Sequence, residues 1–151
     1  MDDPRKFSFP PVIPVAALIL SWLTGLLWPI AIDWPSWARP VGWVLFLAPI
    51  PLAIWGAQTF RQHHTVVDPR GDVTRLVTDG PFRFTRNPMY LSLIILYIGG
   101  TLAFHLPWGV MWLVPVFLAL RYGVIAREEE YMKGKFGDEY VAYTRRVRRW
   151  L

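Results

Sequence analysis

The stretch GPFRFTRNPMYLSLIILYIGGTLAF, residues 80–104, sets two arginines, an asparagine and a proline directly before an uncharged apolar run. Pro88 suits the first position of a helix, where its missing N–H is not needed, and Asn87 before it suits the N-cap. A helix is therefore predicted to begin here with free backbone N–H groups at its start. A helix start of this kind attracts anions, and Arg83 and Arg86 add positive charge beside it.

Tyr90 lies one turn inside the predicted helix and can direct its hydroxyl toward the same corner. With Arg86 and the helix start, it predicts a corner that binds a carboxylate or a phosphate. Composition alone favours a simpler alternative, in which Asn87 caps the helix and the arginines anchor the loop at a membrane surface.

The composition is that of a membrane protein. The chain has 151 residues, room for one domain, and 54% of them are hydrophobic. They lie in long blocks with few or no charges, as membrane-spanning helices do. Because the chain has no cysteine, disulfides, thiolate metal sites and cysteine nucleophiles are excluded. The net charge of +5 is concentrated in particular loops, which reports orientation in a membrane, and no nucleic-acid partner is predicted.

Two apolar blocks precede the opening stretch. Residues 12–32 are uncharged, and at ~1.5 Å per residue they can cross a ~30 Å hydrocarbon core. A cleavable signal peptide is the alternative, but the block is long for its apolar segment and no convincing cleavage site follows. Residues 40–60 form the second block, in which Pro49 and Pro51 predict a kink that neighbouring helices can accommodate.

Two further blocks, residues 88–104 and 108–126, are separated by only three residues and are predicted to form a tight antiparallel hairpin. A charged helix is then expected to continue to about Lys135, to break at Gly137 and to be followed by a short amphipathic helix. The ending RRVRRWL is typical of an interfacial anchor for anionic lipid.

The predicted fold is all-α: one polytopic membrane domain over residues 1–151, with about four transmembrane helices, a hairpin formed by the last two and a carboxyl-terminal amphipathic helix. Most basic residues lie in the amino-terminal tail, in the polar segment 61–86 and in the carboxyl-terminal tail. By the positive-inside rule, both termini are expected on the cytoplasmic side of the inner membrane.

Acidic residues follow the fourth block, whereas basic residues precede the third. Arg121 lies close to membrane depth, where an ionisable side chain needs a partner, and Glu128, two turns later on nearly the same face, is one candidate. Glu129 points to the side. Because the hairpin returns the end of the fourth block beside the start of the third, these carboxylates are expected to meet the anion-binding corner at one cytoplasmic rim. A solvated charged face is the common alternative for Glu128, Glu129 and Glu130.

Other polar or small residues are given more ordinary roles. His63 and His64 have no acidic or histidine partner at metal-ligand spacing, so no metal site is predicted. They are expected to be polar loop residues, and a proton-transfer role for one of them stays open. Gly99 and Gly100 are expected to allow close helix contact rather than to bind a nucleotide.

Two motifs, LVTDGPFRFTRNPMYLS and, after the hairpin, REEEYMKGKFGDEYVAYTRRV, resemble those of the isoprenylcysteine carboxyl methyltransferase-like membrane proteins. Phospholipid N-methyltransferases are similar. The family pattern is G-P-Y/F-R-Y/F, then R-H-P-x-Y, then a hairpin, then E-E-x-x-L-x-x-x-F-G-x-x-Y-x-x-Y. The resemblance covers residues 76–147, and the combination, in this order and around a hairpin, is specific.

The resemblance implies that S-adenosylmethionine binds at the cytoplasmic rim, under a tail that contains Phe136, Gly137 and Tyr143. One position departs from the family, because Asn87 stands where histidine is frequent. Asparagine can hydrogen-bond but cannot carry charge or take a proton at neutral pH, which argues against an acid–base role there. By this resemblance the expected cofactor-binding residues are Gly80, Arg86, Asn87, Tyr90, Glu128, Glu129 and Tyr140, and the expected catalytic residues are Glu129 and Arg86.

The implied activity is S-adenosylmethionine-dependent methyl transfer to a lipophilic acceptor, such as a carboxylate or an amine, that enters from the bilayer. A carboxylate or a free amine needs little base catalysis, whereas a phenol or a protonated amine needs a base, for which Glu129, His63 and His64 are candidates. The expected partners are this acceptor and membrane lipids. Two alternatives are an NADPH-dependent membrane reductase of the sterol-reductase type and a non-catalytic membrane protein that binds lipid headgroups or a partner.

Overall fold

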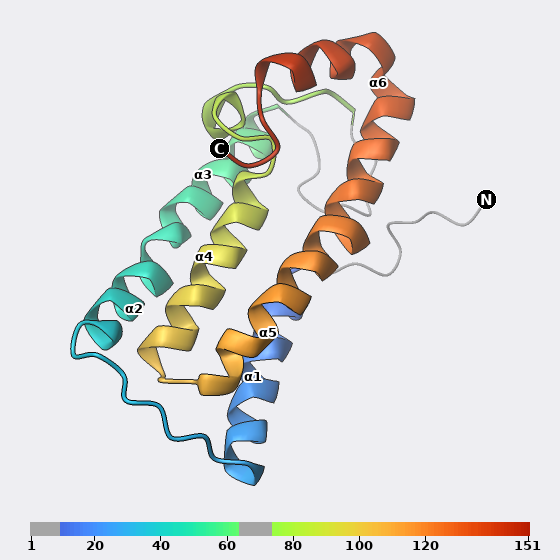
Figure 1. The fold of residues 1–151 in the computed structure, drawn as a ribbon. Coiled ribbons are helices and arrows are strands. Elements are labelled where there is room, and N and C mark those ends of the chain that lie inside the picture. The colour runs from blue at the N-terminus through green and yellow to red at the C-terminus, as the bar shows by residue number, and fades with distance from the viewer. Residues whose placement is uncertain (1–9, 64–73) are drawn as a thin grey trace.

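The computed structural model describes residues 10–63 and 74–151, and every regular element in that part of the chain is helical (Figure 1). The predicted all-α fold is therefore confirmed. The elements are α1 (Val12–Leu27), α2 (Ala38–Leu47), α3 (Pro49–Gln62), the 3₁₀ turn η1 (Gly80–Arg83), α4 (Pro88–Ala103), α5 (Pro107–Leu118), the π-helix η2 (Ala119–Ile125) and α6 (Ala126–Arg146).

α4 is the central helix of the bundle. It packs against α2 and α3 on one side and against α5 and α1 on the other (Figure 1). Tyr97 of α4 is fully buried, and its hydroxyl donates a 2.8 Å hydrogen bond to the carbonyl oxygen of Gly109 in α5. This bond satisfies a buried polar group and ties the two arms of the hairpin together. The core that includes Tyr97 is completed by Ala17, Tyr90, Val116, Leu120, Val124 and Ile125.

α2 and α4 come close together at two glycines. A Cβ atom on Gly99 would lie 2.3 Å from the backbone nitrogen of Phe46, and a Cβ atom on Gly42 would lie 2.3 Å from the backbone nitrogen of Ala103. No side chain fits at these distances, so the two backbones pack directly against each other. Gly100 faces the Leu18 side chain of α1, where a Cβ atom would lie 3.0 Å from Cδ1. The predicted role of Gly99 and Gly100 in helix contact is confirmed.

The bundle has the length and surface of a membrane protein. Two helical stretches, Ala38–Gln62 and Pro107–Arg146, each contain a segment long and apolar enough to cross a bilayer, and α1 and α4 are apolar helices of 16 residues each. Large apolar side chains are exposed on the outer helices, among them Leu26 of α1 and Met111 of α5. A bilayer removes this surface from water, as a membrane protein requires.

α1 is shorter than predicted. The apolar pattern predicts a helix through residue 32, whereas α1 ends at Leu27. Trp28 precedes Pro29, and the residue before a proline is pushed out of the α region; Trp28 has φ −133° and ψ 81°. The Trp28 N–H bonds to the carbonyl oxygen of Thr24 at 2.8 Å and closes the last turn. The prediction is therefore wrong from residue 28 onward.

The second block is divided where its prolines predict. Helical structure begins at Ala38, is interrupted at Ala48 and resumes at Pro49. Proline has no N–H to donate and crowds the carbonyl group four residues earlier, so a regular helix cannot pass through this point unchanged.

α4 and α5 form the predicted hairpin. The N–H of Leu106 bonds to the carbonyl oxygen of Thr101 at 2.9 Å, and the N–H of His105 bonds to that of Leu102 at 3.3 Å. With His105 at φ 50°, this is a Schellman ending, which reverses the chain within three residues. The turn returns everything after α5 to the end of the bundle where α4 begins (Figure 1).

The fourth block contains a π-helix that the sequence does not predict. Pro115 lies inside α5, and Ala119–Ile125 follows with π-helical hydrogen bonding. These bonds run from residue i to i+5, so each turn holds an extra residue. Side chains seven residues apart, such as Arg121 and Glu128, then no longer share a face, as they would in an α-helix.

α6 breaks at Gly137, as predicted. Gly137 has φ 50° and ψ −124°, a conformation that favours glycine because it carries no Cβ. The first part of α6 continues the line of α5, and the part after Gly137 turns across the end of the bundle where α3 ends and α4 begins (Figure 1).

We expect Gly99→Ala to lower the free energy of unfolding by about 1–3 kcal/mol, because the added methyl group must separate α2 from α4. Gly123→Ala is the matched control, since a Cβ atom at Gly123 meets no atom within 4 Å. Unfolding of both variants in detergent measures the difference, and equal stability would contradict the close approach.

We expect Gly137→Ala to lower the free energy of unfolding by about 1–2 kcal/mol, because a Cβ atom disfavours positive φ. Gly134→Ala lies in the regular part of the same helix with open space around it, and should be neutral or raise stability by up to about 1 kcal/mol. The same unfolding measurement compares the pair. A Gly137→Ala variant as stable as Gly134→Ala would show that the break is not fixed by this residue.

Candidate active site

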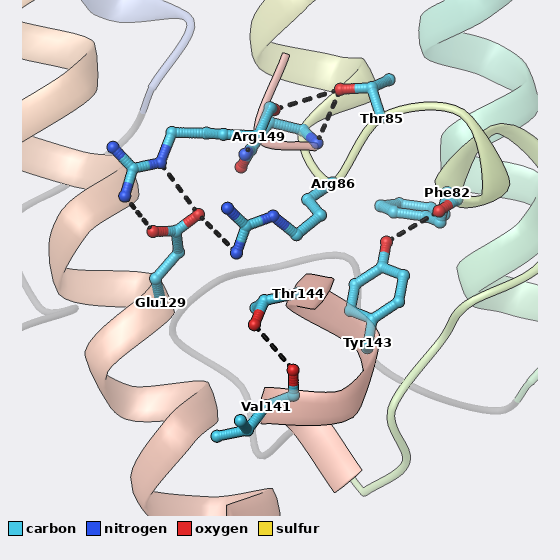
Figure 2. Close-up of polar contacts among 9 residues, drawn as sticks. Phe82, Thr85, Arg86, Glu129, Val141, Tyr143, Thr144 and Arg149 are labelled. Atoms are coloured by element: carbon cyan, nitrogen blue, oxygen red, sulfur yellow. Dashed lines mark hydrogen bonds and ion pairs between the residues drawn. The ribbon is translucent and has the colours of Figure 1, made fainter. Parts of the chain in front are cut away.

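An ion pair joins the start of α4 to α6. Nη1 of Arg86, which lies two residues before α4, is 3.3 Å from Oε1 of Glu129 (Figure 2). The two side chains are largely buried, with exposed fractions of 14% and 15%. The hairpin of α4 and α5 thus brings Arg86, which precedes it in the chain, to Glu129, which follows it. The topology predicts this meeting.

A second arginine shares the same carboxylate. Arg149 donates from Nε to Oε1 of Glu129 at 3.1 Å and from Nη2 to Oε2 at 2.5 Å (Figure 2). This two-pronged contact matches the planar guanidinium group to the carboxylate. The hydrogen bonds to Glu129 raise the pKa of the Arg149 guanidinium further above its ordinary value. Two cations therefore share the one carboxylate of Glu129.

The last residues of the chain are held across the start of α4. The N–H of Arg86 donates to the carbonyl oxygen of Arg148 at 3.0 Å. The carbonyl oxygen of Arg149 accepts from the Thr85 hydroxyl at 3.1 Å and from the side-chain amide of Asn87 at 3.0 Å. We call residues 148–150 the strap. Its backbone contacts position the Arg149 side chain over Glu129.

The strap overturns one expectation. Asn87 occupies the N-cap position of α4, but its side chain makes no capping hydrogen bond, and its amide nitrogen donates to the strap. In the ending RRVRRWL, Arg149 is paired with Glu129 and Trp150 packs against the core of the bundle. Arg145, Arg146 and Arg148 are exposed, so an interfacial anchor stays a prediction for these three arginines.

The other predicted glutamate binds a tyrosine. The Tyr90 hydroxyl, one turn inside α4, donates to Oε1 of Glu128 at 2.5 Å. Tyr90 is buried and belongs to the core, so this contact draws Glu128 toward the start of α4. The neighbouring glutamates of α6 therefore take different partners near the same helix end, Glu128 the tyrosine and Glu129 the arginines. Glu130 is exposed.

The part of α6 after Gly137 covers this region with tyrosines. Tyr140 and Tyr143 are buried with Leu76, and the Tyr143 hydroxyl donates to the carbonyl oxygen of Phe82 at 2.7 Å (Figure 2). This segment lies beyond the apolar spans. Burial first, and the charge of Glu129 second, raise the pKa of Tyr140 to about 12, so its hydroxyl stays protonated beside the ion pairs.

Gly80 and Arg83 lie outside this cluster. Gly80 has φ 55°, and a Cβ atom on it would lie 2.6 Å from Oγ1 of Thr59, so it packs η1 against α3. Arg83 is exposed at the end of η1. The structure therefore gives Gly80 a packing role and leaves it without a contact to the ion pairs.

His63 forms its own pair. Its Nε2 lies 2.8 Å from both carboxylate oxygens of Asp79, which links the end of α3 to the residue before η1. The hydrogen bond from His63 holds the pKa of Asp79 below its ordinary value. No contact joins His63 to Glu129 in the described part of the chain, and His64 lies outside the described residues.

Arg121 is not paired with Glu128. Its Cζ lies 5.4 Å from the ring centre of Tyr122 and 6.0 Å from that of Phe117, and its Nε is buried without a hydrogen-bond partner among the described residues. The π-helix is the physical reason, because it rotates Glu128 away from the face of Arg121.

Thr85 and Arg149 are the site residues that the sequence does not single out. Arg149 is one of four arginines in RRVRR, and nothing in that run distinguishes the one that reaches Glu129. Thr85 stands between the two motif pieces that carry the resemblance. Residue type does not mark either of them. Thr85 and Arg149 join the site because the backbone of the strap lies across the start of α4.

The described residues contain no group of three or more histidine, cysteine, aspartate or glutamate side chains arranged to hold a metal ion. The cluster offers two guanidinium groups, two carboxylates and tyrosine hydroxyls. Such a set suits a ligand that carries both negative and positive charges.

These features define a helical membrane protein with a cluster of polar and charged side chains at one end of its bundle. The chain belongs to the phospholipid methyltransferase family, whose model matches residues 37–139. This match includes α2 and α3, which the motif resemblance does not, and it ends before Tyr140 and the strap. Membership indicates a membrane methyltransferase that acts on lipids.

One relative, an uncharacterized protein of Haemophilus influenzae (strain ATCC 51907 / DSM 11121 / KW20 / Rd), is 41% identical over 63 residues. The match covers 42% of this chain and the whole of the relative. No solved structure matches the chain.

We expect the Glu129–Arg149 pair to show a coupling energy of about 1 kcal/mol or more in a double-mutant cycle of Glu129→Gln and Arg149→Gln, because both charges are partly buried and bound at two points. The measurement is the free energy of unfolding of the two single variants and the double variant. Additive effects would contradict the pairing. A cycle of Glu130→Gln with Arg145→Gln, both exposed, is the control and should be additive.

Proposed function

We propose that the protein transfers a methyl group from S-adenosylmethionine to a phospholipid headgroup at the cytoplasmic rim of its bundle. The observation that supports this most is the cluster at the start of α4. There two guanidinium groups share one carboxylate, and Nε of Arg86 is buried without a hydrogen-bond partner among the described residues. The unpaired N–H of Arg86 and the two guanidinium groups suit the carboxylate of the methionine part of the cofactor.

The start of α4 supports the same placement. The side chain of Asn87 does not cap the helix, because its amide binds the strap. Pro88 follows at the first position and has no N–H of its own. The positive end of the helix dipole is therefore left to a ligand carboxylate beside Arg86.

The glutamates supply the complementary charge. Glu128 and Glu129 follow each other on α6, and their carboxylates suit the ammonium group, the ribose hydroxyls and the sulfonium of the cofactor. The cofactor supplies an electrophilic methyl group on that sulfonium. Glu129 is the group we assign to stabilise the positive charge and to receive the proton that an amine acceptor loses on methylation.

The strap and the tyrosines of α6 keep the rim dry. Tyr140 and Tyr143 are buried, and residues 148–150 cross the start of α4. Exclusion of water strengthens the interactions of Arg86 and Glu129 with a charged ligand and holds the reacting groups in line. Because the rim borders the apolar spans, a lipid acceptor can reach it from the bilayer.

The orientation follows from charge. The end of the bundle that carries the rim also carries the basic carboxyl-terminal residues, and the loop after α3 is rich in arginine, so we place this end in the cytoplasm. On this basis the cofactor, which is soluble, approaches from the cytoplasm and the acceptor from the membrane.

S-adenosylhomocysteine, the demethylated product, should bind the detergent-purified protein saturably, and Glu129→Gln should weaken this binding by about tenfold or more, since a charge-assisted hydrogen bond is lost. Isothermal titration calorimetry measures both. Glu130→Gln is the matched control, because Glu130 is the adjacent glutamate but is exposed, and it should leave binding unchanged.

Titration with NADPH in parallel separates the alternatives. Binding of NADPH instead of S-adenosylhomocysteine to the folded protein would contradict methyl transfer and favour a reductase. Binding of neither would favour a non-catalytic role. Tyr90→Phe, which keeps the ring but removes the hydroxyl from Glu128, provides a second variant if Glu129→Gln fails to fold.

A further inference from the structure

Arg121 is a cation at the end of the apolar span that no carboxylate neutralises within the described residues. Its Nε is buried without a hydrogen-bond partner, and its Cζ lies near the rings of Phe117 and Tyr122. The π-helix separates it from Glu128, the carboxylate that α-helical spacing would bring to it. An ionisable side chain at this depth is energetically costly, so an unpaired one indicates a ligand.

A second unpaired donor lies against the same ring. Trp150, in the strap, packs on Phe117 with ring centres 5.6 Å apart, and its Nε1 is buried without a hydrogen-bond partner. Arg121 and Trp150 therefore approach Phe117 from segments that are far apart in the chain. Both leave an N–H group that the described residues do not satisfy. A buried donor without an acceptor is destabilising.

The acceptor that suits these two donors is an anion. A guanidinium group binds phosphate through several N–H groups at once, and an indole N–H adds a single neutral donor.

An exposed apolar stripe leads along the helix to Arg121. Val110, Val114, Leu118 and Tyr122 follow one another at intervals of four residues on α5 and η2, and each is exposed. In a bilayer this stripe contacts acyl chains. Arg121 stands at its end, next to Tyr122.

The polarity along the helix follows the order of groups in a phospholipid. The apolar stripe comes first, Arg121 next, and Glu128 and Glu129 last. Seven residues separate Arg121 from Glu128, about 10 Å along a helix axis, a distance that two long side chains can shorten to the span between a phosphate and a headgroup amine. A lipid lying along this helix would place its chains beside the stripe and its phosphate beside Arg121, with its amine at the level of Glu128 and Glu129.

We propose that Arg121 and the indole N–H of Trp150 form a subsite for the phosphodiester of the phospholipid acceptor. This inference rests on the proposed function, and it goes further by assigning residues that bind the acceptor. The subsite fixes the phosphate at the edge of the apolar stripe, so that the headgroup extends toward Glu129.

The test compares two short-chain lipids that differ in the phosphate. Binding of dihexanoyl phosphatidylethanolamine and of dihexanoylglycerol to the full chain in detergent is measured for the unaltered protein and for Arg121→Gln, Arg121→Lys and Trp150→Phe. Arg127→Gln is the matched control, because Arg127 lies six residues further on and is exposed. S-adenosylhomocysteine binding is measured on each sample.

Arg121→Gln should raise the Kd for phosphatidylethanolamine by about tenfold and leave that for dihexanoylglycerol unchanged, because the lost bonds are to the phosphate. Arg121→Lys should restore part of the affinity as a point charge, and Trp150→Phe should raise the Kd by about threefold. Arg127→Gln should change neither Kd.

Equal Kd values for phosphatidylethanolamine in Arg121→Gln and in the unaltered protein would overturn the subsite, as would equal losses for both lipids. Displacement of the lipid by inorganic phosphate at a concentration near the lipid's own Kd would show a site for free phosphate instead. S-adenosylhomocysteine binding should survive Arg121→Gln. If the unaltered protein does not bind it, the proposed function fails, while the phosphate-dependent difference between the two lipids still decides the subsite.

Discussion

The carboxylate of Glu129 is the point on which the polar end of the molecule depends. Arg86 reaches it from the segment before α4, and Arg149 reaches it from the strap, so a single side chain joins three parts of the chain. Removing it would leave the largely buried Arg86 and the partly buried Arg149 without this partner, which is more destabilising than the loss of the contacts alone.

Much of the fold is predictable because apolar length, proline and glycine act locally. The four apolar blocks, the division at Ala48 and the break at Gly137 follow from rules that involve a few neighbouring residues. The early end of α1 follows such a rule as well, because Trp28 precedes a proline. The uncharged run continues past this proline, and its length predicts a longer helix than the structure has. The π-helix has no comparable signal, and it changes which side chains face each other.

The site is predictable where topology decides it and unpredictable where the carboxyl-terminal backbone does. A hairpin must return α6 to the start of α4, so the meeting of Arg86 with Glu129 follows once the hairpin is recognised. The strap binds Thr85 and Asn87 through a carbonyl oxygen, which every residue possesses, so side-chain chemistry cannot reveal it. The same contact explains why Asn87, a strong N-cap residue by type, does not cap α4.

The short first helix has a consequence for the surrounding lipid. Sixteen residues of α1 extend about 24 Å, less than the ~30 Å hydrocarbon core of a typical bilayer. α1 packs against α5, so this mismatch borders the face that carries the apolar stripe. Thinning of the adjoining leaflets is one response to such a mismatch, and it draws headgroups inward at a modest elastic energy per ångström. The energy of bilayer deformation around the protein therefore depends on membrane thickness, and thin bilayers accommodate the chain with the least deformation.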